Sequence, residues 1–160
     1  MTAGSNFVGD ESDFDFLIGS WNVVNRRLKT HWVGGDEWDE FPATSELETR
    51  LNRVVNIDEF IARARGFSGM SLRILDQKTR QWAIYWINSK TGVLFPPVYG
   101  GFNGDRGEFY GADMDDGRPV RVRFIWTKQG ANNARWEQAF SLDGETWETN
   151  WIMEFTRVKD

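Results

Sequence analysis

The chain is 160 residues long, with 40% hydrophobic and 15% aromatic residues, a length and composition typical of one domain with a substantial core. The absence of cysteine excludes disulfides and thiolate metal sites, and a net charge of −5 at pH 7 argues against a nucleic-acid partner, whose phosphates require a basic surface. The sequence has no run of about 18 apolar residues and no basic segment followed by an apolar run, so we expect no membrane span and no signal peptide. The acidic composition, with a pI near 5.0, is ordinary for a cytoplasmic protein, and we expect a cytoplasmic location.

The first residues favour a flexible end followed by one short helical turn. Residues 1–12 are polar and contain glycine, so we expect a flexible N-terminus and a single domain over residues 13–158. In residues 12–18, Ser12 can cap a helix, and Asp13 and Asp15 suit a first helical turn. The segment is too short to be stable alone, so we expect it to pack against a larger element.

The rest of the chain alternates apolar and polar residues, which predicts about ten strands. The predicted strands cover residues 21–33, 41–51, 59–67, 71–75, 81–87, 98–102, 108–112, 120–127, 135–141 and 146–156. Most connections are short, and successive strands joined by tight turns form a meander that closes into a barrel when the strands are this numerous. The predicted fold is therefore all-β, an antiparallel up-and-down barrel of about ten strands with a short N-terminal helical turn.

The predicted strand 81–87 is apolar on both faces. One face carries Trp82, Ile84 and Trp86, and the other carries Ala83, Tyr85 and Ile87. A strand that is apolar on both faces is covered on both faces. Two covers are open: residues 14–18, or a second subunit in a homodimer.

Asp143 and Gly144 predict a two-residue type I′ turn between the last two strands, because both central positions of that turn need a positive φ. Counting outward from this turn gives the predicted register, which pairs Phe140 with Trp147, Gln138 with Thr149 and Trp136 with Trp151.

Several segments carry a family resemblance. Gly19-Ser20-Trp21 resembles the glycine-x-tryptophan signature of lipocalins and other calycins. With residues 14–18, 69–73, 82–86 and 141–151, it is similar to the bacterial DUF1579-type domain, over roughly residues 13–157. This resemblance implies a calycin-like barrel and no particular catalytic residue. Nitrobindins are related barrels that bind haem through a histidine near the C-terminus, whereas His31 lies near the N-terminus, so we expect neither haem nor another cofactor.

Two groups of residues are candidates for acid–base or metal chemistry. His31 is the one histidine, so a Ser-His-Asp or metal-histidine site would depend on it; a strand-end packing role is the favoured interpretation. Asp113, Asp115 and Asp116 look like a cation loop, but the position where an EF-hand has glutamate is Phe124. A solvated turn without a metal is therefore expected.

Arginines on the predicted third and fourth strands have two interpretations. Arg63, Arg65 and Arg73 could line an anion site, because guanidinium groups match carboxylate and phosphate. The favoured interpretation places them outside the barrel, paired with Glu46 and Glu48.

Five tryptophans fall on predicted inward faces and either fill the barrel or line an apolar cavity. A cavity is favoured, because ligand pockets are mostly apolar with a few convergent polar groups. The predicted ligand-binding residues are Trp82, Trp86, Asn88, Tyr99, Trp126, Trp136, Gln138 and Trp151.

Three functions remain open on this basis. The favoured one is a small-molecule-binding barrel for an apolar or aromatic ligand. The second is an enzyme, such as an isomerase or cyclase, which requires a titratable group inside the barrel; an inward carboxylate or arginine would favour it. The third is a structural homodimer with a filled core.

Overall fold

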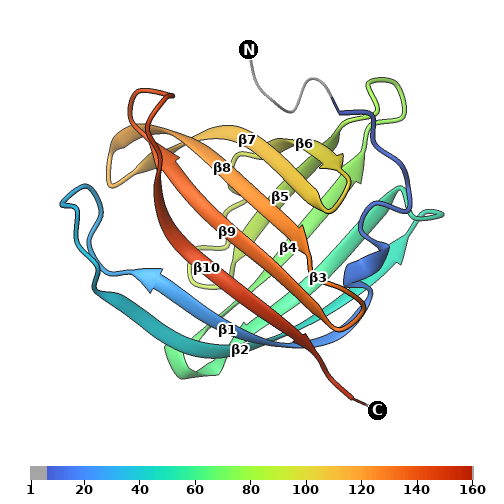
Figure 1. The fold of residues 1–160 in the computed structure, drawn as a ribbon, viewed down its shortest axis with the longest axis horizontal. Coiled ribbons are helices and arrows are strands. Elements are labelled where there is room, and N and C mark those ends of the chain that lie inside the picture. The colour runs from blue at the N-terminus through green and yellow to red at the C-terminus, as the bar shows by residue number, and fades with distance from the viewer. Residues whose placement is uncertain (1–6, 160) are drawn as a thin grey trace.

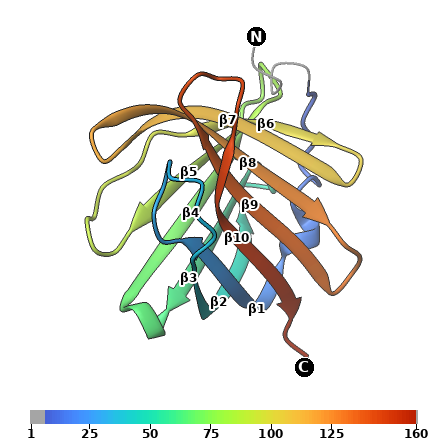
Figure 2. The ribbon, with the colours of Figure 1, turned by 60° about the vertical axis from the view of Figure 1, so that its left-hand side comes forward.

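A computed structural model of the protein describes residues 7–159, and ten antiparallel strands close into a barrel in the order predicted from the sequence. Each strand pairs with the next along the chain, and the last pairs with the first (Figures 1 and 2). The strands are β1 Gly19–Leu28, β2 Trp38–Arg50, β3 Val55–Ala62, β4 Phe67–Leu75, β5 Trp82–Asn88, β6 Val98–Asn103, β7 Arg106–Asp115, β8 Arg118–Lys128, β9 Asn133–Ser141 and β10 Glu148–Arg157. The predicted all-β, up-and-down barrel is therefore confirmed.

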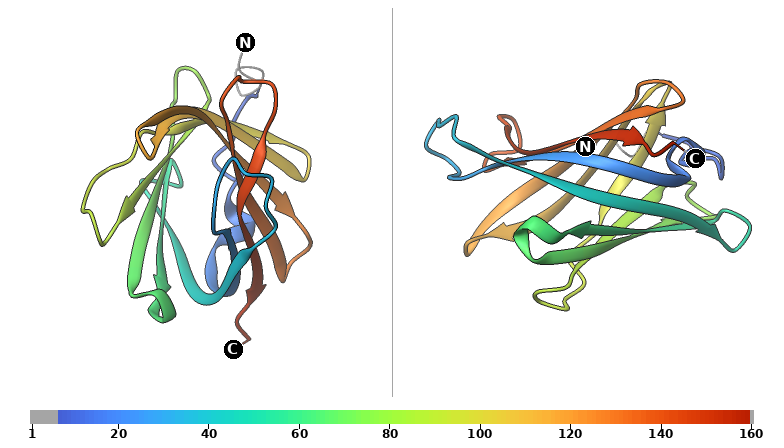
Figure 3. Two further views of the ribbon diagram at one scale, coloured as in Figure 1. Left: turned by 90° about the vertical axis from the view of Figure 1, so that its left-hand side faces the viewer. Right: turned by 90° about the horizontal axis from the view of Figure 1, so that it is seen from below.

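Pairing of β1 with β10 closes the barrel. The register runs from Trp21 opposite Arg157 to Arg27 opposite Trp151, and Figure 3 shows the sheet curving round to this seam. Alternate residues of β1, such as Trp21, Val23 and Asn25, are buried. This period of two places one face of every strand inside the barrel. No helix among residues 7–159 is long and apolar enough to cross a membrane.

The predicted helical turn is present as a 3-10 turn, η2 Asp15–Leu17. Its N-cap residue is Phe14, without a side-chain cap, so the predicted capping by Ser12 is wrong. Phe14 and Leu17 are buried, and the Phe14 ring packs edge-on against Trp82 with centroids 4.9 Å apart. The turn therefore closes one end of the barrel, which we call the plugged end.

Part of the predicted flexible stretch 1–12 lies outside the described residues, because the structure describes the chain from residue 7 onward. Within the described part, Gly9 donates its backbone N–H to the carbonyl of Arg80 over 2.6 Å, and Arg80 Nε donates to the Gly9 carbonyl over 3.1 Å. These bonds attach the entering chain to the loop before β5.

The third predicted strand, 59–67, is wrong after Ala62. The chain there forms a 3-10 turn, η3 Arg63–Arg65, and reverses at Gly66, which has a left-handed φ of 68°. Glycine adopts this conformation without steric cost. The strand β3 instead begins earlier, at Val55, which adds Asn56 and Asp58 to the inward face.

The predicted register of the last hairpin is also wrong. Trp151 lies opposite Gln138 and Met153 opposite Trp136, with a register shift between Thr149 and Trp151. The connection is a wider loop over residues 142–147, because the Asp143 carboxylate accepts hydrogen bonds from the backbone N–H groups of Glu145 and Thr146, both over 2.8 Å. These bonds hold the pKa of Asp143 well below its usual range.

The paired positive φ values expected for an Asp-Gly hairpin occur at a different place. Asp116 and Gly117 have φ values of 50° and 80°, between the paired residues Asp115 and Arg118. This is the pattern of a type I′ turn. The acidic stretch 113–116 therefore ends β7 and forms the β7–β8 turn, as expected for a hairpin.

Candidate functional site

The interior of the barrel contains a cavity of about 300 Å³. It extends from Arg73, whose guanidinium carbon lies 5.2 Å from the Phe14 ring centroid at the plugged end, to Asp113 and Asp115 at the end of β7. Because the strands run up and down, the end of β7 lies at the opposite end of the barrel, beside the β1–β2 and β9–β10 loops. We call this opposite end the loop end.

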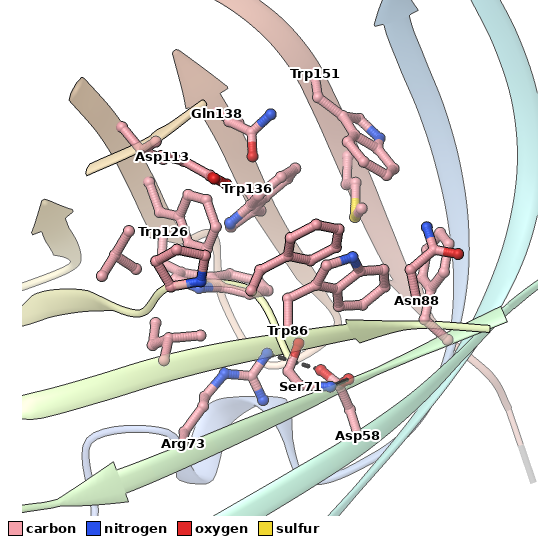
Figure 4. Close-up of a pocket in the computed structure, with 18 of the residues that line it drawn as sticks. Asp58, Ser71, Arg73, Trp86, Asn88, Asp113, Trp126, Trp136, Gln138 and Trp151 are labelled. Atoms are coloured by element: carbon pink, nitrogen blue, oxygen red, sulfur yellow. Dashed lines mark hydrogen bonds and ion pairs between the residues drawn. The ribbon is translucent and has the colours of Figure 1, made fainter. Parts of the chain in front are cut away.

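All but two of the predicted ligand-binding residues line this cavity. The residues in its wall are Trp86, Asn88, Trp126, Trp136, Gln138 and Trp151. Figure 4 shows their side chains converging from several strands on one space. Their role as ligand contacts stays a prediction.

The other two predicted residues lie elsewhere. Trp82 is fully buried at the plugged end, where its Nε1 donates to Asp13 Oδ2 over 2.9 Å and Phe14 covers its ring. Tyr99 is 48% exposed, because its neighbours Val98 and Gly100 take the inward positions of β6. Trp82 is therefore part of the plug, and Tyr99 is on the outside of the barrel.

The aromatic wall of the cavity is held by contacts between its own rings. Trp136 packs edge-on against Trp151 with ring centroids 5.7 Å apart and against Phe124 at 5.0 Å. Trp151 Nε1 donates to Asn25 Oδ1 over 3.0 Å, which orients the indole. Edge-to-face aromatic pairs stabilise by roughly 0.5–1.5 kcal/mol beyond their burial, so the wall is organised without a ligand.

A charged pair lies deep in the cavity, near the plugged end. Arg73 Nη2 contacts Asp58 Oδ2 over 2.7 Å, and Arg73 Nη1 donates to Asn56 Oδ1 over 3.1 Å. The backbone N–H of Ser71 donates to Asp58 Oδ1 over 2.9 Å. Arg73, Asp58 and Ser71 all line the cavity (Figure 4).

This pair corrects the interpretation of the arginines. Arg73 is inside the barrel and does not pair with Glu46 or Glu48, whereas Arg65 pairs with Asp39 at the start of β2. The signal in the sequence was the alternation of Ser71, Arg73 and Leu75 on one face of β4. The prediction misses this signal because the facing residues Asn56 and Asp58 lie before the predicted third strand, 59–67, although β3 begins at Val55.

Arg73 stacks against aromatic rings, and two buried N–H donors in this part of the cavity lack hydrogen-bond partners among the described residues. Its guanidinium carbon lies 5.5 Å from the Trp126 ring centroid as well as 5.2 Å from that of Phe14. Arg73 Nε and Trp126 Nε1 are buried and have no hydrogen-bond partner within the described chain. An unpaired buried donor costs about 1–3 kcal/mol, so the deep part of the cavity is not optimised for stability alone.

Amide groups lie nearer the loop end. Gln138 Nε2 donates to Asn150 Oδ1 over 2.8 Å across the irregular register of β9 and β10. Asn88 Oδ1 accepts the backbone N–H of Lys90 over 2.8 Å. Each amide keeps further hydrogen-bonding capacity for a molecule in the cavity.

His31 lies at the loop end rather than in a strand, because β1 ends at Leu28. Its Nδ1 is 2.9 Å from Asp115 Oδ2, the same oxygen that accepts from Trp32 Nε1 over 3.0 Å. The Trp32 backbone N–H donates to Glu148 Oε1 over 2.9 Å. These bonds attach the β1–β2 loop, with His31, to β7 and β10.

A second cavity of about 340 Å³ adjoins this loop, lined by residues 29–32 together with Asp115, Asp116 and Arg118. Within residues 7–159, no group of three or more histidine, aspartate or glutamate side chains is placed to hold a metal ion.

Comparison with solved structures identifies a barrel of the same kind. The structure of the S-type phycobiliprotein lyase CPES from Guillardia theta is similar over 98% of this chain and 96% of that chain, with a TM-score of 0.59 and 10% sequence identity. At this identity the likeness establishes the fold, a ten-stranded antiparallel lipocalin-like barrel. No family model and no curated protein matches the chain.

Proposed function

We propose that the protein binds a small, largely apolar aromatic molecule inside its barrel. The observation that carries this proposal is the cavity of about 300 Å³ between Trp86, Trp136 and Trp151. Its volume lies at the lower limit of the range for small-molecule sites, about 300–1,000 Å³, and such sites are mostly apolar with a few polar groups. Both properties fit a compact aromatic ligand.

The contrast between the two ends of the barrel supports binding over a filled core. At the plugged end, Phe14, Trp82 and Phe109 are packed with almost no exposure. Trp86 and Trp151 are only partly buried, although both project inward. A barrel whose aromatic residues served only to fill it would pack both groups equally well.

An enzyme is the second candidate, because a specific observation favours it. Asp58 and Arg73 bring a carboxylate and a guanidinium to the cavity, which is the feature that distinguishes an enzyme from a simple binder. The barrel is also of the kind found in a protein described as a lyase. Conversion of a bound molecule that stops in Asp58→Asn, with binding retained, would support this candidate.

Three narrower predictions remain proposals. Membership of the DUF1579-type family rests on the sequence resemblance, and a cytoplasmic location rests on composition. A homodimer through the outer face of β5 rests on Tyr85 and Ile87, which are partly exposed in the single chain. The N-terminal turn packs against Trp82 on the inward face of β5. Of the two covers considered for the outer face, this leaves the second subunit.

Fluorene, a rigid three-ring hydrocarbon, should bind and quench tryptophan fluorescence saturably. It should also raise the melting temperature, because a ligand at a hundredfold excess over its Kd stabilises the native state by about 2.7 kcal/mol. Trp136→Phe should weaken binding, whereas Trp38→Phe, outside the cavity beneath Arg26, is the matched control. If a panel of aromatic ligands including fluorene gives neither quenching nor a thermal shift, the protein is a filled structural barrel.

A further inference from the structure

The two charged side chains deep in the cavity, Arg73 and Asp58, differ in their exposed fraction. The Arg73 side chain is 2% exposed, covered by the rings of Phe14 and Trp126, whereas the Asp58 side chain is 10% exposed. Ser45 and Ser71 contribute to the wall on either side of Asp58, on the neighbouring strands β2 and β4. A molecule that reaches this depth therefore meets the carboxylate of Asp58 before it meets the guanidinium of Arg73.

The hydrogen bonds of Asp58 leave part of its capacity unused. A carboxylate offers about four acceptor sites. Oδ1 accepts one bond, from the Ser71 backbone N–H, and Oδ2 accepts one, from Arg73 Nη2. Both oxygens therefore retain an acceptor site, and no further hydrogen-bond donor to either oxygen is present among the described residues.

Arg73 pairs with this carboxylate without blocking it. The bond from Nη2 to Asp58 and the second bond from Nη1 to Asn56 hold the guanidinium beside the carboxylate, on the side of the plugged end, under the Phe14 ring. A buried ion pair of this kind is often replaceable by apolar residues without loss of stability. Stability alone therefore does not account for a charged acceptor in an aromatic cavity.

We propose that Asp58 is the polar recognition residue of the cavity, and that it accepts a hydrogen bond from an N–H or O–H group on the edge of an aromatic ligand. This inference rests on the proposed function and narrows it to aromatic molecules with a donor at the end that enters first. The ring lies among Trp86, Trp136 and Trp151, and the donor reaches Asp58 beside Ser71.

The test compares two probes of the same shape, carbazole and fluorene. Carbazole has an N–H group at the position where fluorene has a CH2 group. Calorimetry should show that the wild-type protein binds carbazole about tenfold or more tightly than fluorene, the effect of one hydrogen bond to a charged group. The double variant Asp58→Leu/Arg73→Leu removes the pair without leaving a lone charge. It should bind the two probes with equal affinity.

Two further variants separate recognition from folding. Asp58→Asn keeps the shape of the side chain and should reduce the preference for carbazole several-fold even where the double variant is unstable. Glu59→Gln removes a charge from the next residue of β3, on the exposed outer face, and should leave the preference unchanged.

The outcomes distinguish this inference from the proposed function. Equal binding of both probes by the wild type, or a preference that survives both Asp58 variants, overturns the role of Asp58 and leaves the binding cavity standing. If neither probe binds the wild type, the proposed function fails and the inference fails with it.

Discussion

Arg73→Leu should destabilise the domain by about 3–5 kcal/mol, because removing one partner of a buried ion pair leaves the other charge without compensation. Asp58 would lose the bond from Arg73 Nη2 while remaining buried inside the barrel. Urea unfolding followed by circular dichroism measures the loss.

The double variant Asp58→Leu/Arg73→Leu is the decisive comparison for this effect. It should recover most of the stability, since an apolar pair of similar volume needs no counter-charge. Arg50→Leu, which breaks an exposed pair with Glu48, should cost far less than Arg73→Leu. A single Arg73→Leu variant as stable as the wild type would mean that the Asp58 carboxylate reaches water in solution.

Trp82→Ala should cost about 3–5 kcal/mol, as expected when a fully buried tryptophan is truncated. The variant leaves a void beneath Phe14 and removes the donor to Asp13, so the plug loses both packing and a hydrogen bond. Thermal and urea unfolding should both report the change.

Tyr99→Ala is the matched control, because Tyr99 was predicted with Trp82 as a ligand contact but lies outside the barrel. It should change the free energy of unfolding by only about 0.5 kcal/mol. Neither substitution removes a side chain from the cavity wall. A large loss of fluorene affinity in Tyr99→Ala at unchanged stability would contradict its placement on the outer face.

The barrel was predictable because alternation is a local signal. Val23 and Asn25, or Ser71 and Arg73, face the same way whatever surrounds them, and short turns between strands leave a meander as the simple arrangement. Alternation identifies the face of a residue but not its depth. Trp82 and Trp86 share one face of β5, yet one belongs to the plug and the other to the cavity wall.

The errors arose where a residue's position depends on a distant segment. The bulge before Trp151 shifts the register of β10, and the Asp143 bonds in the preceding loop hold a wide turn. Asp58 falls outside the predicted third strand, 59–67, because Asn56, Ile57 and Asp58 are residues typical of a turn. The partner that makes Asp58 an inward strand residue is Arg73, fifteen residues further along the chain.

A crystal structure of the protein with fluorene tests the binding cavity most directly. We expect density for the ring between Trp86, Trp136 and Trp151, with the Arg73–Asp58 pair intact at the deep end of the cavity. Tryptophan side chains that have moved into the space, with no fluorene inside the barrel, would contradict the proposed function.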